Sequence, residues 1–154
     1  MPLPTNLVTL EGTSLPANEL ENKVILFVNV ASKCGLTPQY SGLVQLDKKY
    51  GERGFKVVAV PCNQFGAQEP GTPAEIKDFT SDKYNVEFTL LEKQDVNGAS
   101  RSPLYQFLVK DGEDISWNFG KFLVGRDGEV LARFEPATAP DDAELQAAIE
   151  KALG

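Results

Sequence analysis

KVILFVNVA, at Lys23–Ala31, sets the architecture of the chain, because it is an almost unbroken run of apolar and largely β-branched residues. This composition is typical of a strand in a parallel sheet that is covered on both faces. Ser32–Leu36 (SKCGL) follows as a loop. Thr37 and Pro38 then have the pattern of a helix start, with Thr37 as the N-cap and Pro38 at the first helical position. We expect this helix to end near Gly51.

A second strand of the same buried type follows the helix at Phe55–Val60 (FKVVAV). The strand–helix–strand unit over Lys23–Pro61 predicts a right-handed crossover between two parallel strands. Two more helices are predicted from their first residues. Thr72–Glu75 (TPAE) has the pattern of a capping box, and Ser102–Pro103 has that of a helix start.

The remaining segments complete an α/β pattern. Trp117–Val124 and Glu129–Phe134 are predicted to form a hairpin around a glycine-rich turn, and Asp141–Leu153 is predicted to be an amphipathic helix. Leu7–Leu15 is predicted to be an N-terminal β-hairpin with its turn near Gly12. The order of elements indicates a thioredoxin-like fold: a mixed β-sheet flanked by helices, in a single domain over residues 1–154.

Composition and charge restrict the possible partners. Fifteen basic residues against 22 acidic ones give a formal net charge of −7, which disfavours binding to nucleic acid and to anionic membranes. The first six residues lack the basic stretch and long apolar run of a secretory signal. The longest apolar stretch is too short to span a bilayer. We therefore expect a cytoplasmic protein without stable membrane anchoring.

Missing residue types restrict the chemistry. The chain has no histidine, which excludes Ser-His-Asp and Cys-His nucleophile pairs, histidine-ligated zinc and histidine-ligated haem. Its only two cysteines, Cys34 and Cys62, cannot form a four-cysteine zinc or iron–sulfur site within one chain, and they do not form a C-x-x-C motif.

Cys34 stands just past the carboxyl end of the first predicted strand and before a helix, where open α/β sheets place reactive groups. N–H groups at a helix start favour the thiolate, the nucleophilic form of cysteine, and Lys33 adds a positive charge beside it. Position alone leaves open whether Cys34 is reactive or an inert core cysteine. For Cys62, which follows Pro61 and precedes no helix directly, the structural interpretation is favoured.

Three blocks resemble one family, the glutathione peroxidases. Asn29–Gly35 (NVASKCG) resembles the family's active-site segment, in which selenocysteine or cysteine takes the place of Cys34. Pro61–Pro70 (PCNQFGAQEP) is similar to its second signature. Trp117–Phe119 (WNF), followed by Lys121–Val124 (KFLV), is similar to its third. The blocks occur in the family's order and spread over most of the chain.

The resemblance implies a catalytic tetrad of Cys34, Gln68, Trp117 and Asn118, with Gln64 as a structural glutamine. The indole and amide N–H groups could stabilise a sulfur anion and polarise a peroxide. The implied reaction is reduction of hydrogen peroxide and of organic or lipid hydroperoxides, in which Cys34 becomes a sulfenic acid and external thiols regenerate it. Such an antioxidant enzyme of the oxidative stress response needs no metal or organic cofactor.

The chain also departs from the family pattern. Thioredoxin-dependent relatives carry a resolving cysteine where this chain has Ser81, two places after Phe79. Either an external thiol, glutathione or thioredoxin, reduces Cys34 directly, or Cys62 acts as the resolving cysteine; we favour the external thiol. The short segment Leu108–Ser116 resembles the monomeric, phospholipid-hydroperoxide-type branch of the family.

Two other functions are weighed against the peroxidase. A peroxide sensor, or redox relay, would pass its oxidation on to a partner protein, and a missing resolving cysteine would lengthen the life of its sulfenic acid. A thiol–disulfide oxidoreductase is disfavoured by the lack of a C-x-x-C motif.

Overall fold

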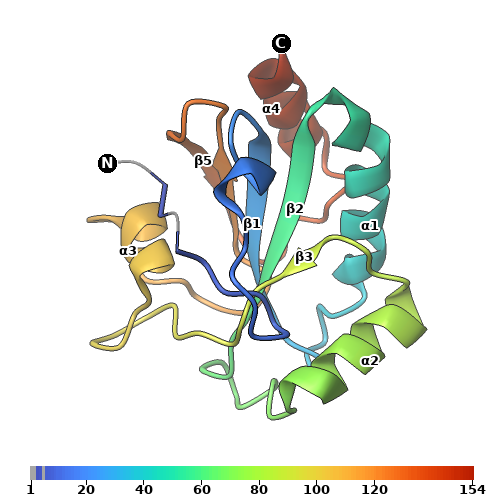
Figure 1. The fold of residues 1–154 in the computed structure, drawn as a ribbon, viewed down its shortest axis with the longest axis vertical. Coiled ribbons are helices and arrows are strands. Elements are labelled where there is room, and N and C mark those ends of the chain that lie inside the picture. Colours follow the sequence, from blue (N-terminus) through green and yellow to red (C-terminus); the bar gives the residue numbers. More distant parts are fainter. Residues whose placement is uncertain (1–2, 5) are drawn as a thin grey trace.

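The computed structural model describes residues 3–4 and 6–154; Met1, Pro2 and Thr5, which belong to the N-terminal segment assessed above for a signal, lie outside the described residues. A five-stranded sheet in the order β3-β2-β1-β4-β5 forms the centre of the molecule (Figure 1). Its strands are β1 (Val24–Val30), β2 (Phe55–Pro61), β3 (Thr89–Leu90), β4 (Lys121–Val124) and β5 (Val130–Phe134). β1–β2 and β2–β3 are parallel pairs, and β1–β4 and β4–β5 are antiparallel pairs. The sheet is therefore mixed, as predicted.

Two apolar layers cover the sheet. The helices of the described residues are α1 (Gln39–Tyr50), α2 (Pro73–Tyr84), α3 (Pro103–Val109) and α4 (Ala143–Leu153), with 3-10 turns at Ala17–Glu19 and Gly51–Arg53. α1 and α4 lie on one side of the sheet and α3 on the other (Figure 1). Side chains of β1 alternate between the two layers: Leu26 and Val28 pack with α1 and α4, whereas Ile25 and Phe27 pack with α3. This alternation explains why β1 is buried throughout and almost entirely apolar.

The predicted N-terminal hairpin is very short. Val8 and Ser14 form a single antiparallel bridge, and the turn between them uses Gly12 at φ +87°, a conformation that suits glycine. Thr9 in turn bridges Leu91, next to β3. The hairpin thus covers the β3 edge of the sheet and does not add full strands to it.

Three boundaries differ from the predictions. The two-residue strand β3 was not predicted, because a short edge strand leaves no periodic pattern. The predicted strand Trp117–Val124 begins only at Lys121, since Phe119 adopts φ +71° and ends the extended conformation before it. Thr37 is not the N-cap of α1: the helix begins at Gln39, and the Thr37 hydroxyl points back toward the preceding loop.

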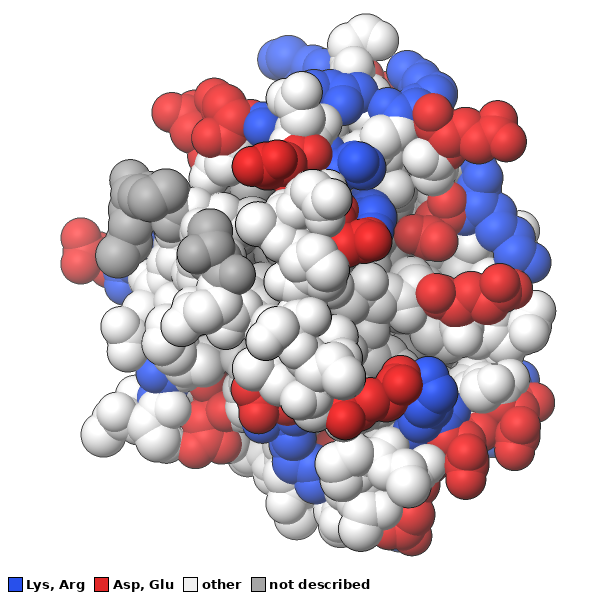
Figure 2. Space-filling model, in the orientation of Figure 1, with Lys and Arg blue, Asp and Glu red and all other residues white. Residues whose placement is uncertain are grey.

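The other predicted helix starts are confirmed. The side chains of Thr72, Ser102 and Asp142 each cap the helix that follows, and Thr72 forms the predicted reciprocal box with Glu75. Acidic and basic side chains are interspersed over the face shown in Figure 2. Among the described residues, no helix has the length and apolar character needed to cross a bilayer.

Candidate active site

Cys34 lies in the loop that joins the carboxyl end of β1 to α1, at the centre of the sheet. Cys34 is a buried residue, 8% exposed, in the apolar layer of α1 and α4. Its neighbours Lys33 and Gly35 are exposed. The loop on both sides of Cys34 is therefore in contact with solvent.

Two N–H groups point at the Cys34 sulfur. The indole Nε1 of Trp117 donates to Sγ at 3.3 Å, and the backbone N–H of Leu36 donates to the same Sγ at 3.3 Å. Donors aimed at a sulfur favour its charged form over the neutral thiol. Trp117 is 37% exposed, so the pair of donors is at the molecular surface, where a substrate can approach.

Gln68 and Asn118 meet beside this pair. Asn118 Nδ2 donates to Gln68 Oε1 at 3.1 Å, which leaves the Gln68 amide N–H group free to serve as a donor. The backbone carbonyl of Gln68 accepts from Lys33 N at 3.0 Å and so joins its loop to the loop of Cys34. Gln68 is half-buried and Asn118 is fully buried. All four predicted residues thus come together, although neither amide side chain contacts Sγ directly.

The loop of Gln68 must approach the Trp117 ring closely. Phe65 packs on that ring with the two centroids 5.8 Å apart. Gly66 adopts φ +66°, and a Cβ there would stand 3.2 Å from the Trp117 ring. Glycine satisfies both the backbone conformation and the close contact. The indole is therefore held between this loop and its own turn.

Asn29, a fully buried residue of β1, holds the Trp117–Gly120 turn. Its Nδ2 donates to Trp117 O at 3.1 Å, its backbone O accepts from Phe119 N at 2.6 Å, and its backbone N donates to Gly120 O at 3.3 Å. These bonds hold Phe119 in a left-handed conformation, which is unfavourable for a bulky side chain.

Lys121 secures the same turn from the other side. Its fully buried ammonium donates to Phe119 O at 2.6 Å and to Pro136 O at 3.2 Å. Pro136 O also accepts from Gln39 Nε2 at 2.9 Å, at the start of α1. Burial lowers the pKa of Lys121 to about 8. A buried cation therefore connects the turn of Trp117 with the helix that follows Cys34.

The buried carboxyl group of Glu69 is hydrogen-bonded to the loop of Cys34. Glu69 is fully buried, and its Oε1 accepts from Ser32 N at 3.1 Å. Its own backbone N–H donates to Asn63 Oδ1 at 2.9 Å. Burial raises the pKa of Glu69, and the hydrogen bonds from Ser32 partly oppose that rise.

Cys62 lies on the opposite face of the sheet from Cys34. It is fully buried in the layer around α3, while Cys34 belongs to the layer of α1 and α4. Both cysteines are free thiols, and burial raises the pKa of the Cys62 thiol. Gln64 acts structurally, because its Oε1 accepts from the backbone N–H groups of Val96 and Asn97.

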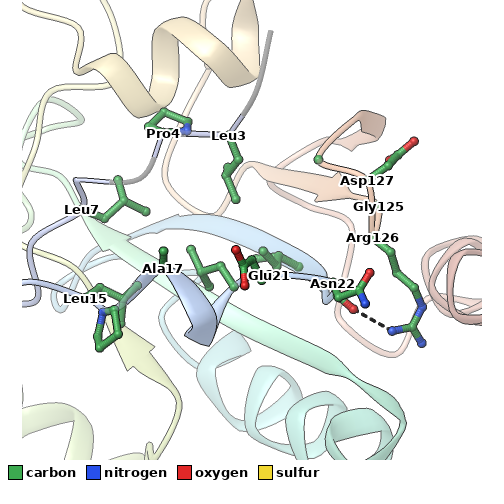
Figure 3. Close-up of a pocket in the computed structure, with 14 residues that line it drawn as sticks. Leu3, Pro4, Leu7, Leu15, Ala17, Glu21, Asn22, Gly125, Arg126 and Asp127 are labelled. Atoms are coloured by element: carbon green, nitrogen blue, oxygen red, sulfur yellow. Dashed lines mark hydrogen bonds between the residues drawn. The ribbon is translucent and has the colours of Figure 1, made fainter.

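A separate apolar pocket lies at the other end of β1. Its lining includes Leu7, Leu15 and Ile25 together with the β4–β5 turn, where Arg126 donates to Asn22 O at 2.8 Å (Figure 3). Because Cys34 follows the carboxyl end of β1 and this pocket lies at the amino end, the pocket plays no part in the site.

Sequence reasoning missed four residues that support the site: Asn29, Thr37, Glu69 and Lys121. Three of them carried a recognisable signal. An asparagine and a lysine within apolar strand patterns, and a glutamate beside Gln68, are polar residues at positions expected to be buried, and such residues need specific partners.

Comparison with solved structures first identifies the class of fold. A crystal structure of a thiol:disulfide interchange protein of the thioredoxin family from Chlorobium tepidum superimposes with a TM-score of 0.73, covering 100% of this chain and 98% of that one. The sequences are 18% identical, so the likeness concerns the fold alone. The protein has a thioredoxin-like fold, as predicted.

Comparison of sequences then identifies the family. The glutathione peroxidase family model matches residues 4–109. The hydroperoxy fatty acid reductase Gpx2 of Synechocystis is 75% identical over 154 residues, which are 100% of both chains. The crystal structure of T. cruzi GPX1 is 30% identical with a TM-score of 0.77, covering 96% of this chain and 93% of that one.

The chain belongs to the glutathione peroxidase family. It is therefore an oxidoreductase of the peroxidase class, an enzyme that reduces hydroperoxides at the expense of a thiol.

Proposed function

We propose that Cys34 is the residue that reduces the hydroperoxide, with Trp117, Gln68 and Asn118 as its supporting catalytic groups. The observation that carries this assignment is the pair of N–H donors, Trp117 Nε1 and Leu36 N, each 3.3 Å from the Cys34 sulfur. In this proposal the Gln68 amide N–H group, whose oxygen is held by Asn118, donates to a bound peroxide oxygen.

The chemical steps follow from the thiolate. Its sulfur attacks one peroxide oxygen, the O–O bond breaks, and with one proton the products are a Cys34 sulfenic acid and an alcohol or water. A first thiol condenses with the sulfenic acid, releasing water and forming a mixed disulfide. A second thiol attacks that disulfide, releasing the external disulfide and the reduced Cys34.

We propose that the reducing thiols come from outside the chain, from glutathione or thioredoxin. Cys62 is fully buried on the other face of the sheet, and a disulfide requires Cα atoms within about 7 Å with suitable side-chain directions. The position that carries a resolving cysteine in some relatives is Ser81 here.

Fatty-acid hydroperoxides are the proposed preferred substrates. The relative that is 75% identical is named a hydroperoxy fatty acid reductase. Trp117, which is 37% exposed, and the half-buried Leu36 offer apolar surface beside the sulfur for an acyl chain. We also propose that the enzyme works as a cytoplasmic monomer; light scattering of the purified protein tests the monomer.

Hydroperoxide consumption by the intact chain and by Cys34→Ser tests the assignment. We expect turnover of a fatty-acid hydroperoxide with glutathione or with the thioredoxin system, and a loss of at least 1,000-fold in Cys34→Ser, which lacks the nucleophile. Turnover that survives Cys34→Ser would refute the assignment. Rapid formation of the sulfenic acid without turnover with either reductant would identify the sensor or relay instead.

Two glutamines form a matched pair for the second test. Gln68→Ala is expected to slow sulfenic acid formation about 10- to 100-fold in single-turnover measurements, because it removes a donor to the peroxide. Gln64→Ala removes bonds to Val96 and Asn97 and should lower the melting temperature without slowing that step. Equal rates in the two variants would exclude Gln68 from the catalytic group.

A further inference from the structure

The loop of Cys34 is closed by bonds that run in both directions between Cys34 and Thr37. The Cys34 backbone N–H donates to Thr37 Oγ1 at 3.0 Å, and Thr37 N donates to Cys34 O at 3.1 Å. The Thr37 hydroxyl donates a hydrogen bond to Ala31 O at 2.8 Å. Thr37 is 4% exposed, so these bonds are sheltered from water.

A standard capping box at the start of α2 serves as a comparison. There the Thr72 hydroxyl accepts from Glu75 N at 3.2 Å, and the Glu75 carboxylate accepts from Thr72 N at 2.9 Å. In such a capping box, the first side chain accepts a backbone N–H of the first turn, and the fourth side chain accepts the N–H of the first residue.

Cys34–Thr37 (CGLT) shares one half of this pattern, the bond from the fourth side chain to the first N–H, but its first side chain accepts from the third residue. The first side chain, the Cys34 sulfur, accepts from Leu36 N at 3.3 Å, and the fourth side chain, the Thr37 hydroxyl, accepts from Cys34 N. Bonds from Thr37 N to Cys34 O and from Tyr40 N to Thr37 O continue as tight turns into α1.

We propose that the Cys34–Thr37 turn directs Leu36 N–H at the sulfur, and that Thr37 is the positioning residue that holds this turn in place for the reaction of Cys34. This inference rests on the proposed role of Cys34. A thiolate accepts a hydrogen bond more strongly than a neutral thiol does, so a turn that directs Leu36 N–H at the sulfur favours the anion.

Thr37 acts through the backbone because its hydroxyl contacts the N–H of Cys34 and the carbonyl of Ala31, and not the sulfur itself. Without that hydroxyl, both backbone groups would lose their partner in a buried place. The loop would then change conformation so that the Cys34 N–H and the Ala31 carbonyl find other hydrogen-bond partners. As a result, Leu36 N–H would no longer point at Sγ.

Three substitutions isolate this effect. Thr37→Val has nearly the same shape and lacks the hydroxyl, and Thr37→Ser keeps the hydroxyl. Thr80→Val is the matched control, because Thr80 is 1% exposed and its hydroxyl donates to backbone carbonyls within α2, away from Cys34.

Two readouts follow Cys34 itself in each variant. One is the second-order rate constant for sulfenic acid formation at pH 7. The other is the pH dependence of Cys34 alkylation, measured on the isolated Cys34 peptide by mass spectrometry. In Thr37→Val we expect a five- to tenfold slower oxidation and an alkylation midpoint at higher pH by about one unit, as for the loss of one hydrogen bond.

At a pH where Cys34 is fully ionised, alkylation of Thr37→Val should match the unmodified chain within threefold, because only the thiolate population has changed. Thr37→Ser should restore both readouts to within threefold. Thr80→Val should lower the melting temperature and leave both readouts unchanged.

Unchanged oxidation and alkylation in Thr37→Val, with a melting temperature lowered as in Thr80→Val, would show that Thr37 is only structural and would overturn the inference. That outcome is distinct from failure of the proposed function, which would appear as peroxidase turnover in Cys34→Ser.

Discussion

At the scale of single residues, the proposed chemistry depends on the hydrogen-bond donors that contact the Cys34 sulfur. Cys34 receives one side-chain donor, Trp117, and one backbone donor, Leu36. Asn118 Nδ2 donates to Gln68 Oε1, and we expect this bond to orient the glutamine amide. The chain has no histidine to act as a base, so in the proposed mechanism N–H donors assist the Cys34 nucleophile instead.

Replacement of the indole tests this view directly. Trp117→Phe keeps an aromatic ring against Phe65 but removes the N–H that donates to Sγ. We expect sulfenic acid formation to slow about 10- to 100-fold, the usual effect of deleting one preorganised donor. Chemical quench followed by trapping of the sulfenic acid measures this rate in single turnover.

Phe65→Leu serves as the control for Trp117→Phe, because it disturbs the ring packing and keeps the indole N–H. A rate in Trp117→Phe no lower than in Phe65→Leu would show that the ring matters and the N–H does not.

At the scale of elements, two similar sequence patterns were used differently by the fold. Thr72 and Thr37 each directly precede a proline at a predicted helix start, but only Thr72 is an N-cap. Glu75, three places after Thr72, completes a capping box with it, whereas the Thr37 hydroxyl accepts the backbone N–H of Cys34, three places earlier. Local propensity could not distinguish these two registers, because both satisfy the same backbone groups.

The buried Lys121, at the start of β4, is expected to make the free energy of unfolding depend on pH. Its pKa of about 8 lies below the value of about 10.4 for an exposed lysine. Between these values the unfolded chain binds more protons than the folded chain, so the contribution of Lys121 to the free energy of unfolding rises with pH.

We therefore expect the free energy of unfolding of the intact chain, minus that of Lys121→Met, to increase by about 1–2 kcal/mol between pH 7.5 and 9.5. Urea titrations at several pH values measure this difference, and subtraction of the methionine variant removes the titration of tyrosines and thiols. A difference that stays constant over this range would contradict the assignment of the lowered pKa to Lys121.

At the scale of the whole molecule, the sheet separates the two thiols. β1 and β2 both end beside the site, but Cys34 faces the layer of α1 and α4, and Cys62 faces the layer of α3. An intramolecular disulfide would require at least one of the two thiols to leave its layer. This separation is a reason why the reduction of Cys34 should depend on thiols from other molecules.

Cys62→Ser is expected to keep peroxidase turnover within twofold of the intact chain, because its thiol does not take part. It should lower the free energy of unfolding by about 1–3 kcal/mol, since a hydroxyl replaces a thiol in a fully buried apolar place. Mass spectrometry of the peroxide-treated intact chain should show no Cys34–Cys62 disulfide. Detection of that disulfide, together with loss of turnover in Cys62→Ser, would make Cys62 the resolving cysteine.

The sequence by itself determined the thioredoxin-like order of elements and most helix starts, and its resemblance to the glutathione peroxidases indicated the four candidate site residues. These follow from patterns that are short-range: runs of β-branched residues, capping side chains, and motifs of adjacent residues such as WNF. Only the tertiary structure showed the supports around Cys34, namely Asn29, Thr37, Glu69 and Lys121, and the separation of Cys62. Their roles depend on which backbone groups lack partners once the chain is packed, and residues up to 88 positions apart supply those partners.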